Sequence, residues 1–153
     1  MNFAKNRSQG KYNPQASVDS MALRMEVSIG EFLDKITILE IKSERIEDPG
    51  KLENVTKELD LLRGTWERSE LSATDIASQM KTLKQVNEAL WDIEDKIRRK
   101  EADQSFDDEF VQLARSVYQS NDHRAAIKRE LNSLLGSDLV EEKSYPDYTP
   151  PSS

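Results

Sequence analysis

Cysteine is absent from the 153 residues of this chain, and histidine occurs once, as His123. Without cysteine there is no disulfide framework, no thiolate nucleophile and no thiolate metal site, and a cytoplasmic location is the simplest expectation. His123 stands between two charged residues on a helical stretch, where a solvated side chain is a simpler interpretation than a proton relay. The chain also lacks a Glu-x-x-His repeat, a Walker-type phosphate loop and a glycine-rich nucleotide turn. We therefore expect no catalytic residues, no metal site and no cofactor.

Long apolar runs and excess positive charge are missing as well. No stretch approaches the ~20 apolar residues that span a bilayer, and residues 1–20 contain no apolar run that would act as a secretory signal. The formal net charge is −7, whereas a dedicated nucleic-acid binder needs clustered Lys and Arg for phosphate contacts. We expect neither a membrane nor a nucleic acid as partner.

Amphipathic helices are what the sequence does contain. Hydrophobic residues make up 36% and charged residues 33%, a balance typical of helices with solvated outer faces, and glycine and proline number only five each. Capping signals open helices at Ser28, Asp48, Ser72 and Ser105, and Gly136 ends the last one. We predict an all-α, elongated helical bundle: two shorter N-terminal helices and a long antiparallel hairpin of two ~30-residue helices.

Composition divides the chain into three parts. Residues 1–24 are polar and are expected to form a disordered N-terminal leader. Residues 25–136 carry the helical periodicity and form the bundle domain, and residues 137–153, rich in proline, form an extended C-terminal tail. Either tail is a candidate for contact with a protein partner.

The first helix is apolar nearly all round. Phe32, Ile36 and Leu39 mark one face, and Ile38 and Ile41 lie on other sides. A helix that is apolar on every side is buried on every side, so this helix is either central to the fold or faces a second subunit. We expect a homo-oligomer formed through it.

The fourth helix changes character along one stripe. Its first half is apolar, but the same face continues through Asn121, Arg124 and Lys128, where a core requires apolar side chains. Burying such groups without partners costs several kcal/mol, on the order of the usual penalty for unpaired polar groups. We expect Asn87 of the third helix to lie opposite Asn121. We also expect Glu40 to be the most buried carboxylate and to pair with Lys128 or Arg124.

A polar belt between the first and fourth helices is therefore the candidate site. Its simpler interpretation is a buried network of ion pairs and amides that specifies packing or oligomeric state. The alternative is a pocket for an anionic or sugar-like ligand. The expected belt consists of Glu40, Lys42, Arg45, Tyr118, Asn121, Arg124 and Lys128.

Several long strings resemble a known family. The strings are EVSIGEFLDKITILEIKSERI at residues 26–46, LWDIEDKIRRKE at 90–101, FVQLARSVYQSNDHRAAIKRELN at 110–132 and LGSDLVEEKSY at 135–145. Together they resemble an uncharacterised bacterial and phage family, a domain of unknown function. Members of that family tend to accompany glycosyltransferase and lipopolysaccharide-synthesis genes, which implies a link to surface polysaccharide or to phage biology. The resemblance assigns no catalytic residues.

Two functions remain open at this point. The first is a non-enzymatic interaction or oligomerisation module, accessory to surface-polysaccharide synthesis or encoded by a phage. The second is a small enzyme or ligand-binding protein that holds an anion or sugar inside the bundle. For the second, the string FLDKITILEIKSERI at residues 32–46 is similar to the first helix of helical chorismate mutases.

Overall fold

A computed structural model describes residues 22–146 of the chain, and this part is all-helical, with no strand among the described residues. The predicted helical bundle is confirmed. The disorder expected for the leader stays a prediction, because most of the leader, residues 1–21, lies outside the described residues. Residues 147–153 also lie outside them. The elements are α1 (Ile29–Arg45), α2 (Pro49–Glu67), a 3-10 helix η1 (Glu70–Ala73), α3 (Ala77–Ala102) and α4 (Asp108–Leu135).

Local capping decides most helix ends. The Ser28 hydroxyl accepts a hydrogen bond from the Glu31 amide at 3.2 Å, and Gly136 ends α4 at φ 65°, in the left-handed conformation that favours glycine. Asp48 caps α2 as expected, since its carboxylate accepts from the Lys51 amide at 2.8 Å, but the expected caps at Ser72 and Ser105 are wrong. Ser72 lies inside η1, and Asp107 instead of Ser105 caps α4, because its carboxylate both accepts from the Phe110 amide and binds Lys100.

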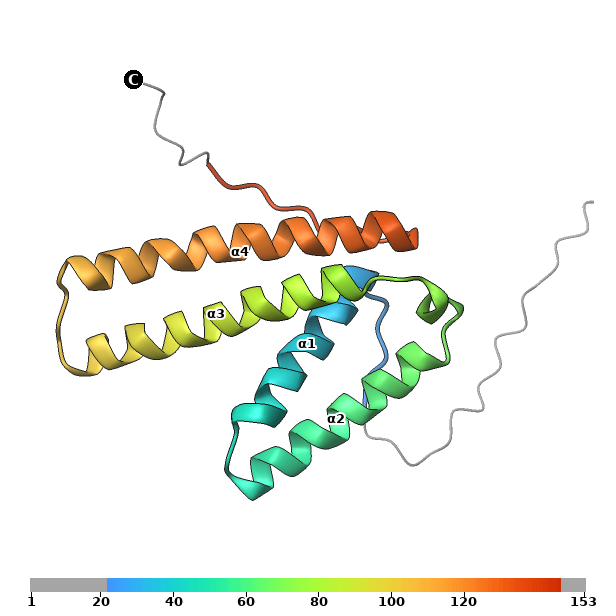
Figure 1. Ribbon diagram of the computed structural model, residues 1–153, viewed down its shortest axis with the longest axis horizontal. Coiled ribbons are helices and arrows are strands. Elements are labelled where there is room, and N and C mark those ends of the chain that lie inside the picture. Colours follow the sequence, from blue (N-terminus) through green and yellow to red (C-terminus); the bar gives the residue numbers. More distant parts are fainter. Residues whose placement is uncertain (1–21, 147–153) are drawn as a thin grey trace, which may run out of the picture.

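The hairpin of α3 and α4 is the longest feature of the fold (Figure 1). Its turn includes Gln104 at φ 51°, and the two helices run antiparallel. At one end of the hairpin, α1 packs against both helices and carries α2 on its other side. Contact with α2, α3 and α4 explains why α1 is apolar all round: it is the central helix of a single chain. The apolar pattern therefore needs no second subunit.

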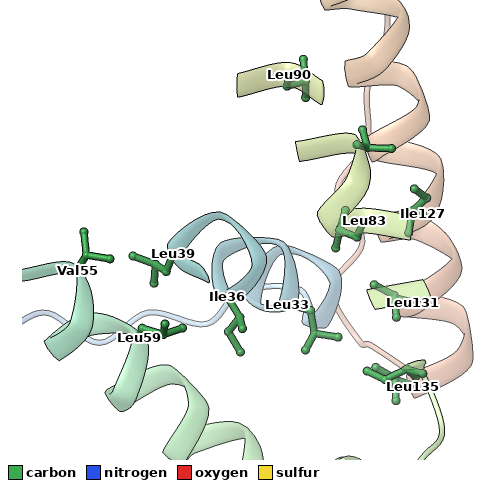
Figure 2. Packing of buried hydrophobic residues seen from close by; sticks show 12 residues of the cluster. Leu33, Ile36, Leu39, Val55, Leu59, Leu83, Leu90, Ile127, Leu131 and Leu135 are labelled. Carbon is green, nitrogen blue, oxygen red and sulfur yellow. The ribbon is translucent and has the colours of Figure 1, made fainter. Parts of the chain in front are cut away.

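The apolar core lies where α1 meets the other helices (Figure 2). Leu33 and Ile36 of α1 pack into a cluster with Leu59 of α2, Leu83 of α3 and Leu131 of α4. From residue 91 to residue 126, all of them described, no side chain is buried. The turn end of the hairpin thus extends beyond α1 and α2 as a two-helix projection.

A glycine lets α1 approach α4 closely. A Cβ at Gly30 would lie 2.4 Å from the backbone oxygen of Lys128, which is well inside contact distance. The Gly30 amide donates to the Asn132 side-chain oxygen at 2.6 Å. The start of α1 is therefore held against the α4 backbone by both shape and a buried hydrogen bond.

Beyond Gly136 the chain turns back along α4 as an extended segment, residues 137–146, which we call the strap. The Ser137 hydroxyl accepts from the Ile29 amide at 3.2 Å. Further along, Glu141 binds Lys128 at 2.6 Å and Glu142 binds Arg129 at 3.2 Å. These contacts hold the strap beside α4.

Among the described residues, no helix has the length and apolar character needed to cross a membrane.

Candidate functional site

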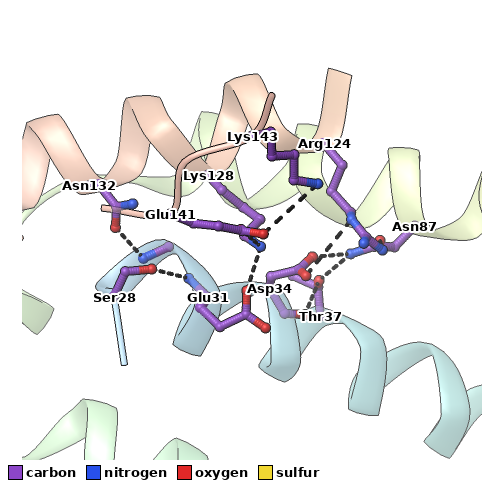
Figure 3. Close-up of polar contacts among 11 residues, drawn as sticks. Ser28, Glu31, Asp34, Thr37, Asn87, Arg124, Lys128, Asn132, Glu141 and Lys143 are labelled. Atoms are coloured by element: carbon purple, nitrogen blue, oxygen red, sulfur yellow. Dashed lines mark hydrogen bonds and ion pairs between the residues drawn. The ribbon is translucent and has the colours of Figure 1, made fainter. Parts of the chain in front are cut away.

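A buried polar cluster joins α1, α3 and α4 (Figure 3). The Asn87 amide donates to the Asp34 carboxylate at 2.7 Å and to the Thr37 hydroxyl at 2.9 Å, and all three residues are buried. Arg124 approaches from α4: its Nη1 donates to the Asn87 oxygen at 3.4 Å, and its Nε lies 4.0 Å from Asp34 Oδ2. Asn87 therefore bonds to α1 and to Arg124 of α4; it lines a common cleft with Asn121, the residue expected opposite it, but its hydrogen bonds go to these other partners.

Among the described residues, Asp34 is the one buried carboxylate. It is 3% exposed, whereas the Glu40 side chain is 24% exposed and binds Arg63 of α2 at 2.7 Å. The expectation for Glu40 is wrong because Asp34 shares a helix face with Thr37, three residues later, and that face meets α3 and α4. Burial raises the pKa of the Asp34 carboxyl, although the hydrogen bond from Asn87 and the charge of Arg124 act in the opposite direction.

Lys128 is paired with carboxylates of its own chain. Its ammonium group forms ion pairs with Glu31 of α1 and Glu141 of the strap. Burial alone would lower the pKa of Lys128, but the hydrogen bonds to Glu141 and Glu31 outweigh it and the pKa is raised. At this residue the two carboxylate partners favour the structural interpretation of the belt over a ligand pocket.

The expected belt is divided by the structure. Tyr118, Asn121 and Arg124 lie together, lining one cleft on α4. Arg45, by contrast, binds Asp92 of α3 at 2.5 Å and lies 5.9 Å from the centre of the Trp91 ring. Lys42 is half-buried in the last turn of α1, lining neither cleft described below, and Glu40 faces α2.

The strap and α4 enclose a cleft of about 480 Å³, which we call the strap cleft. Two cations, Arg124 and Lys143, line it against a single carboxylate, Asp122. Two tyrosines, Tyr118 from α4 and Tyr145 from the strap, supply aromatic surface. Lys143 also lies 3.9 Å from Glu141, so part of its charge is balanced within the strap. The cleft thus combines two cationic side chains with ring faces, a combination that suits an anionic ligand with a sugar or other ring.

On the other side of Arg124, a second cleft of about 390 Å³ lies between α3, α4 and the end of α1; we call it the hairpin cleft. Its charges balance, since Arg98 and Arg124 are matched by Glu94 and Asp95. Its remaining wall is largely apolar and includes Trp91. This cleft has a weaker preference for anions than the strap cleft.

Arg124 stands between the two clefts and lines both. Its Nε is buried and has no hydrogen-bond partner among the described residues. A buried donor without a hydrogen-bond partner costs about 1–3 kcal/mol, and the charge of the Asp34 carboxylate, 4.0 Å from this Nε, offsets part of that cost. Within residues 22–146, no group of three or more His, Asp or Glu side chains is placed to hold a metal ion.

Sequence reasoning missed several residues of the site. Asp34 and Thr37 had a usable signal, because Gly30, Asp34 and Thr37 recur at helical spacing as a small and polar face on an otherwise apolar helix. The strap residues Lys143 and Tyr145 had none. An extended tail has no periodicity that predicts which surface it covers.

Comparison with known proteins yields one match. The profile of a family described as "Family of unknown function (DUF6165)" matches residues 23–153. No curated protein and no solved structure matches the chain. The matched range contains all four α-helices and the strap, so both clefts are built entirely from it.

Proposed function

The chain belongs to the family of unknown function DUF6165, and we propose that it binds a small anionic, sugar-like ligand in the strap cleft. One observation carries the proposal: two cationic side chains, Arg124 and Lys143, line the strap cleft against a single carboxylate, Asp122. Guanidinium groups recognise phosphate and carboxylate through paired hydrogen bonds, so a ligand oxygen is the natural acceptor.

The other lining groups favour a ring-bearing ligand over a bare ion. A volume of about 480 Å³ exceeds what an inorganic anion fills and lies within the range of small-molecule sites. Tyr118 and Tyr145 offer ring faces for a sugar, and the Asn121 side chain supplies both a donor and an acceptor for hydroxyl groups. We therefore propose a sugar phosphate or an acidic sugar as the ligand class.

Binding without catalysis fits this arrangement best. General acid–base catalysis needs a titratable group, tuned by its surroundings, within hydrogen-bond reach of the ligand. Asp34 has such a raised pKa, but it lines neither cleft and is hydrogen-bonded to Asn87. A non-enzymatic binding role is thus the proposed form of the second function considered from the sequence.

The setting is proposed from the family resemblance alone. The link to glycosyltransferase and lipopolysaccharide-synthesis genes, and to phages, supports an accessory role in surface-polysaccharide synthesis, where anionic sugars are abundant. A cytoplasmic location stays a prediction from the lack of cysteine.

Titration with glucose 1-phosphate, glucose and inorganic phosphate, followed by two-dimensional amide NMR, tests the proposal. We expect glucose 1-phosphate to shift amide signals of residues 118–124 and 143–145, with weaker effects from the other two probes. Losing one charge-assisted hydrogen bond should weaken binding by about tenfold or more in Arg124→Met and in Lys143→Gln.

Arg115→Met is the matched control, because Arg115 is an exposed arginine of α4 that lines neither cleft. The proposal fails if glucose 1-phosphate shifts no signal of the strap cleft at about 10 mM, the limit of weak recognition. Equal affinity for inorganic phosphate would contradict the sugar part of the ligand class.

A further inference from the structure

The carboxylate of Asp34 lies close to one of the two cations that line the strap cleft. Its Oδ2 is 4.0 Å from the Nε of Arg124, and Arg124 also lines that cleft. Asp34 points from α1 toward this guanidinium group (Figure 3). Asp34 itself is 3% exposed and lines neither cleft. Its influence on a bound ligand is therefore electrostatic or passes through Arg124.

The negative charge of Asp34 is only partly balanced within the fold. The hydrogen bond to its Oδ1 comes from Asn87, a neutral amide, at 2.7 Å. The Nε of Arg124 has no hydrogen-bond partner among the described residues, and its Nη1 donates to Asn87 at 3.4 Å. A buried charge of this kind acts over a longer range than a surface charge, because the protein interior and its surroundings screen it less than water and salt do.

Charged groups face Asp34 from α1 and α4, whereas α3 presents the neutral amide. Arg124 and Lys128 of α4 contribute positive charge, and Glu31, one turn earlier on α1, contributes negative charge. Lys128 is also paired with Glu31 and with Glu141 of the strap. Burial raises the pKa of Asp34 above its ordinary value of 3.8, despite the two cations. The ionised form of Asp34 is thus already disfavoured before any ligand binds.

An anion bound to Arg124 would bring a second negative charge to the same guanidinium group. Two like charges roughly 8 Å apart, the width of such a bridge, repel enough at an effective dielectric constant of about 20 to change an equilibrium constant tenfold or more. The protonated, neutral Asp34 should therefore bind the anion more tightly than the ionised one. By linkage, the anion raises the pKa of Asp34 further, and the affinity for the anion increases as the pH falls through that pKa.

We propose that Asp34 couples anion binding in the strap cleft to the uptake of one proton from solvent by its own carboxyl group. The inference rests on the proposed function, because it requires the anion to lie at Arg124. At neutral pH the ionised Asp34 weakens anion binding. In acid the proton removes this repulsion, and the proton leaves again when the anion dissociates at neutral pH.

The variant Asp34→Asn tests the coupling, because asparagine keeps the size of the side chain and an oxygen that accepts from Asn87. We expect it to bind glucose 1-phosphate about tenfold more tightly than the unmodified chain at about pH 7.5, by NMR titration. The ratio of the two dissociation constants should approach one toward about pH 4, where Asp34 is increasingly protonated. Using the ratio cancels the titration of the phosphate, which is the same for both proteins.

An affinity of Asp34→Asn that is unchanged or lower at about pH 7.5 overturns the proposal. A lower affinity would show that Asp34 acts mainly by positioning Arg124. The matched control is Asp60→Asn, which neutralises an exposed aspartate of α2 that lines neither cleft. This control should bind like the unmodified chain. An equal gain in both variants would mean that net charge, and not the buried carboxylate, sets the affinity.

A measurement on the unmodified chain decides the question even if Asp34→Asn does not fold. The carbon-13 signal of the Asp34 carboxyl group, followed against pH, gives its pKa directly. We expect excess glucose 1-phosphate to raise this pKa by about one unit, which corresponds to the same tenfold coupling. An unchanged pKa with ligand bound refutes the coupling but leaves the strap cleft as a binding site, whereas the absence of binding refutes both proposals.

Discussion

Replacing Gly30 with alanine tests the contact that seats α1 on α4. The new Cβ would lie 2.4 Å from the Lys128 backbone oxygen and 3.1 Å from the Asn132 side-chain oxygen. The first of these atoms belongs to the α4 backbone, which cannot rotate away. The start of α1 must therefore move outward by about 1 Å to reach ordinary contact distance.

The size of the effect follows from three contributions. Alanine in place of glycine favours the helix by about 0.5–1 kcal/mol. Against this, overpacking costs about 1–3 kcal/mol, and weakening the 2.6 Å bond between the Gly30 amide and Asn132 leaves buried polar groups unsatisfied for about 1–3 kcal/mol more. We expect Gly30→Ala to lower the free energy of unfolding by about 2–4 kcal/mol.

Urea denaturation followed by far-UV circular dichroism measures this difference, with Gly64→Ala as the matched control. Gly64 lies inside α2, where a Cβ would meet only the mobile end of the Arg68 side chain, at 3.0 Å. There the helix preference should dominate and raise the stability by about 0.5–1 kcal/mol. If both variants shift stability in the same direction, or Gly30→Ala equals the unmodified chain, the close approach of α1 and α4 is refuted.

Two further predictions concern ion pairs. Lys128→Met removes the ammonium group that binds Glu31 and Glu141, but both carboxylates are about half exposed and can turn to water. We therefore expect the free energy of unfolding to change by less than about 1 kcal/mol, while amide hydrogen exchange in the strap accelerates. Unchanged exchange in residues 137–146 would show that Lys128 does not hold the strap. The hydrogen bond from Lys100 and that from the Phe110 amide lower the pKa of Asp107 from 3.8 to about 2, so its contribution to stability is present above about pH 4 and is lost as the pH falls toward 2. Urea midpoints between about pH 5 and pH 2 should therefore fall less steeply in Asp107→Asn, and identical slopes would show that this carboxylate does not stabilise the fold.

Much of the fold is readable from local signals. The serine at Ser28 and the glycine at Gly136 act on backbone groups within three or four residues, so their roles follow from neighbouring sequence. The displaced start of α4 shows the limit of the same logic. Asp107 competes successfully with Ser105 because Lys100, on the other helix, also binds its carboxylate.

The candidate site was less accessible to sequence reasoning. The polar stripe with Asn121, Arg124 and Lys128 was visible, but its partners were not. Lys128 pairs with Glu31, which lies 97 residues away, and Arg124 with Asp34, so no local pattern links them. The carboxylate that seemed most central, Glu40, instead turned out to face α2.

The sequence by itself determined the helices, their approximate lengths, the hairpin turn and the existence of polar groups on an inner face, because periodicity and capping are local properties of the chain. Only the tertiary structure decided which of those groups are satisfied. The angle at which α1 meets α4, set by the contact at Gly30, brings Asp34 to Arg124 and leaves Glu40 outside. The path of the strap, which carries no periodic signal, then encloses the cleft at Arg124.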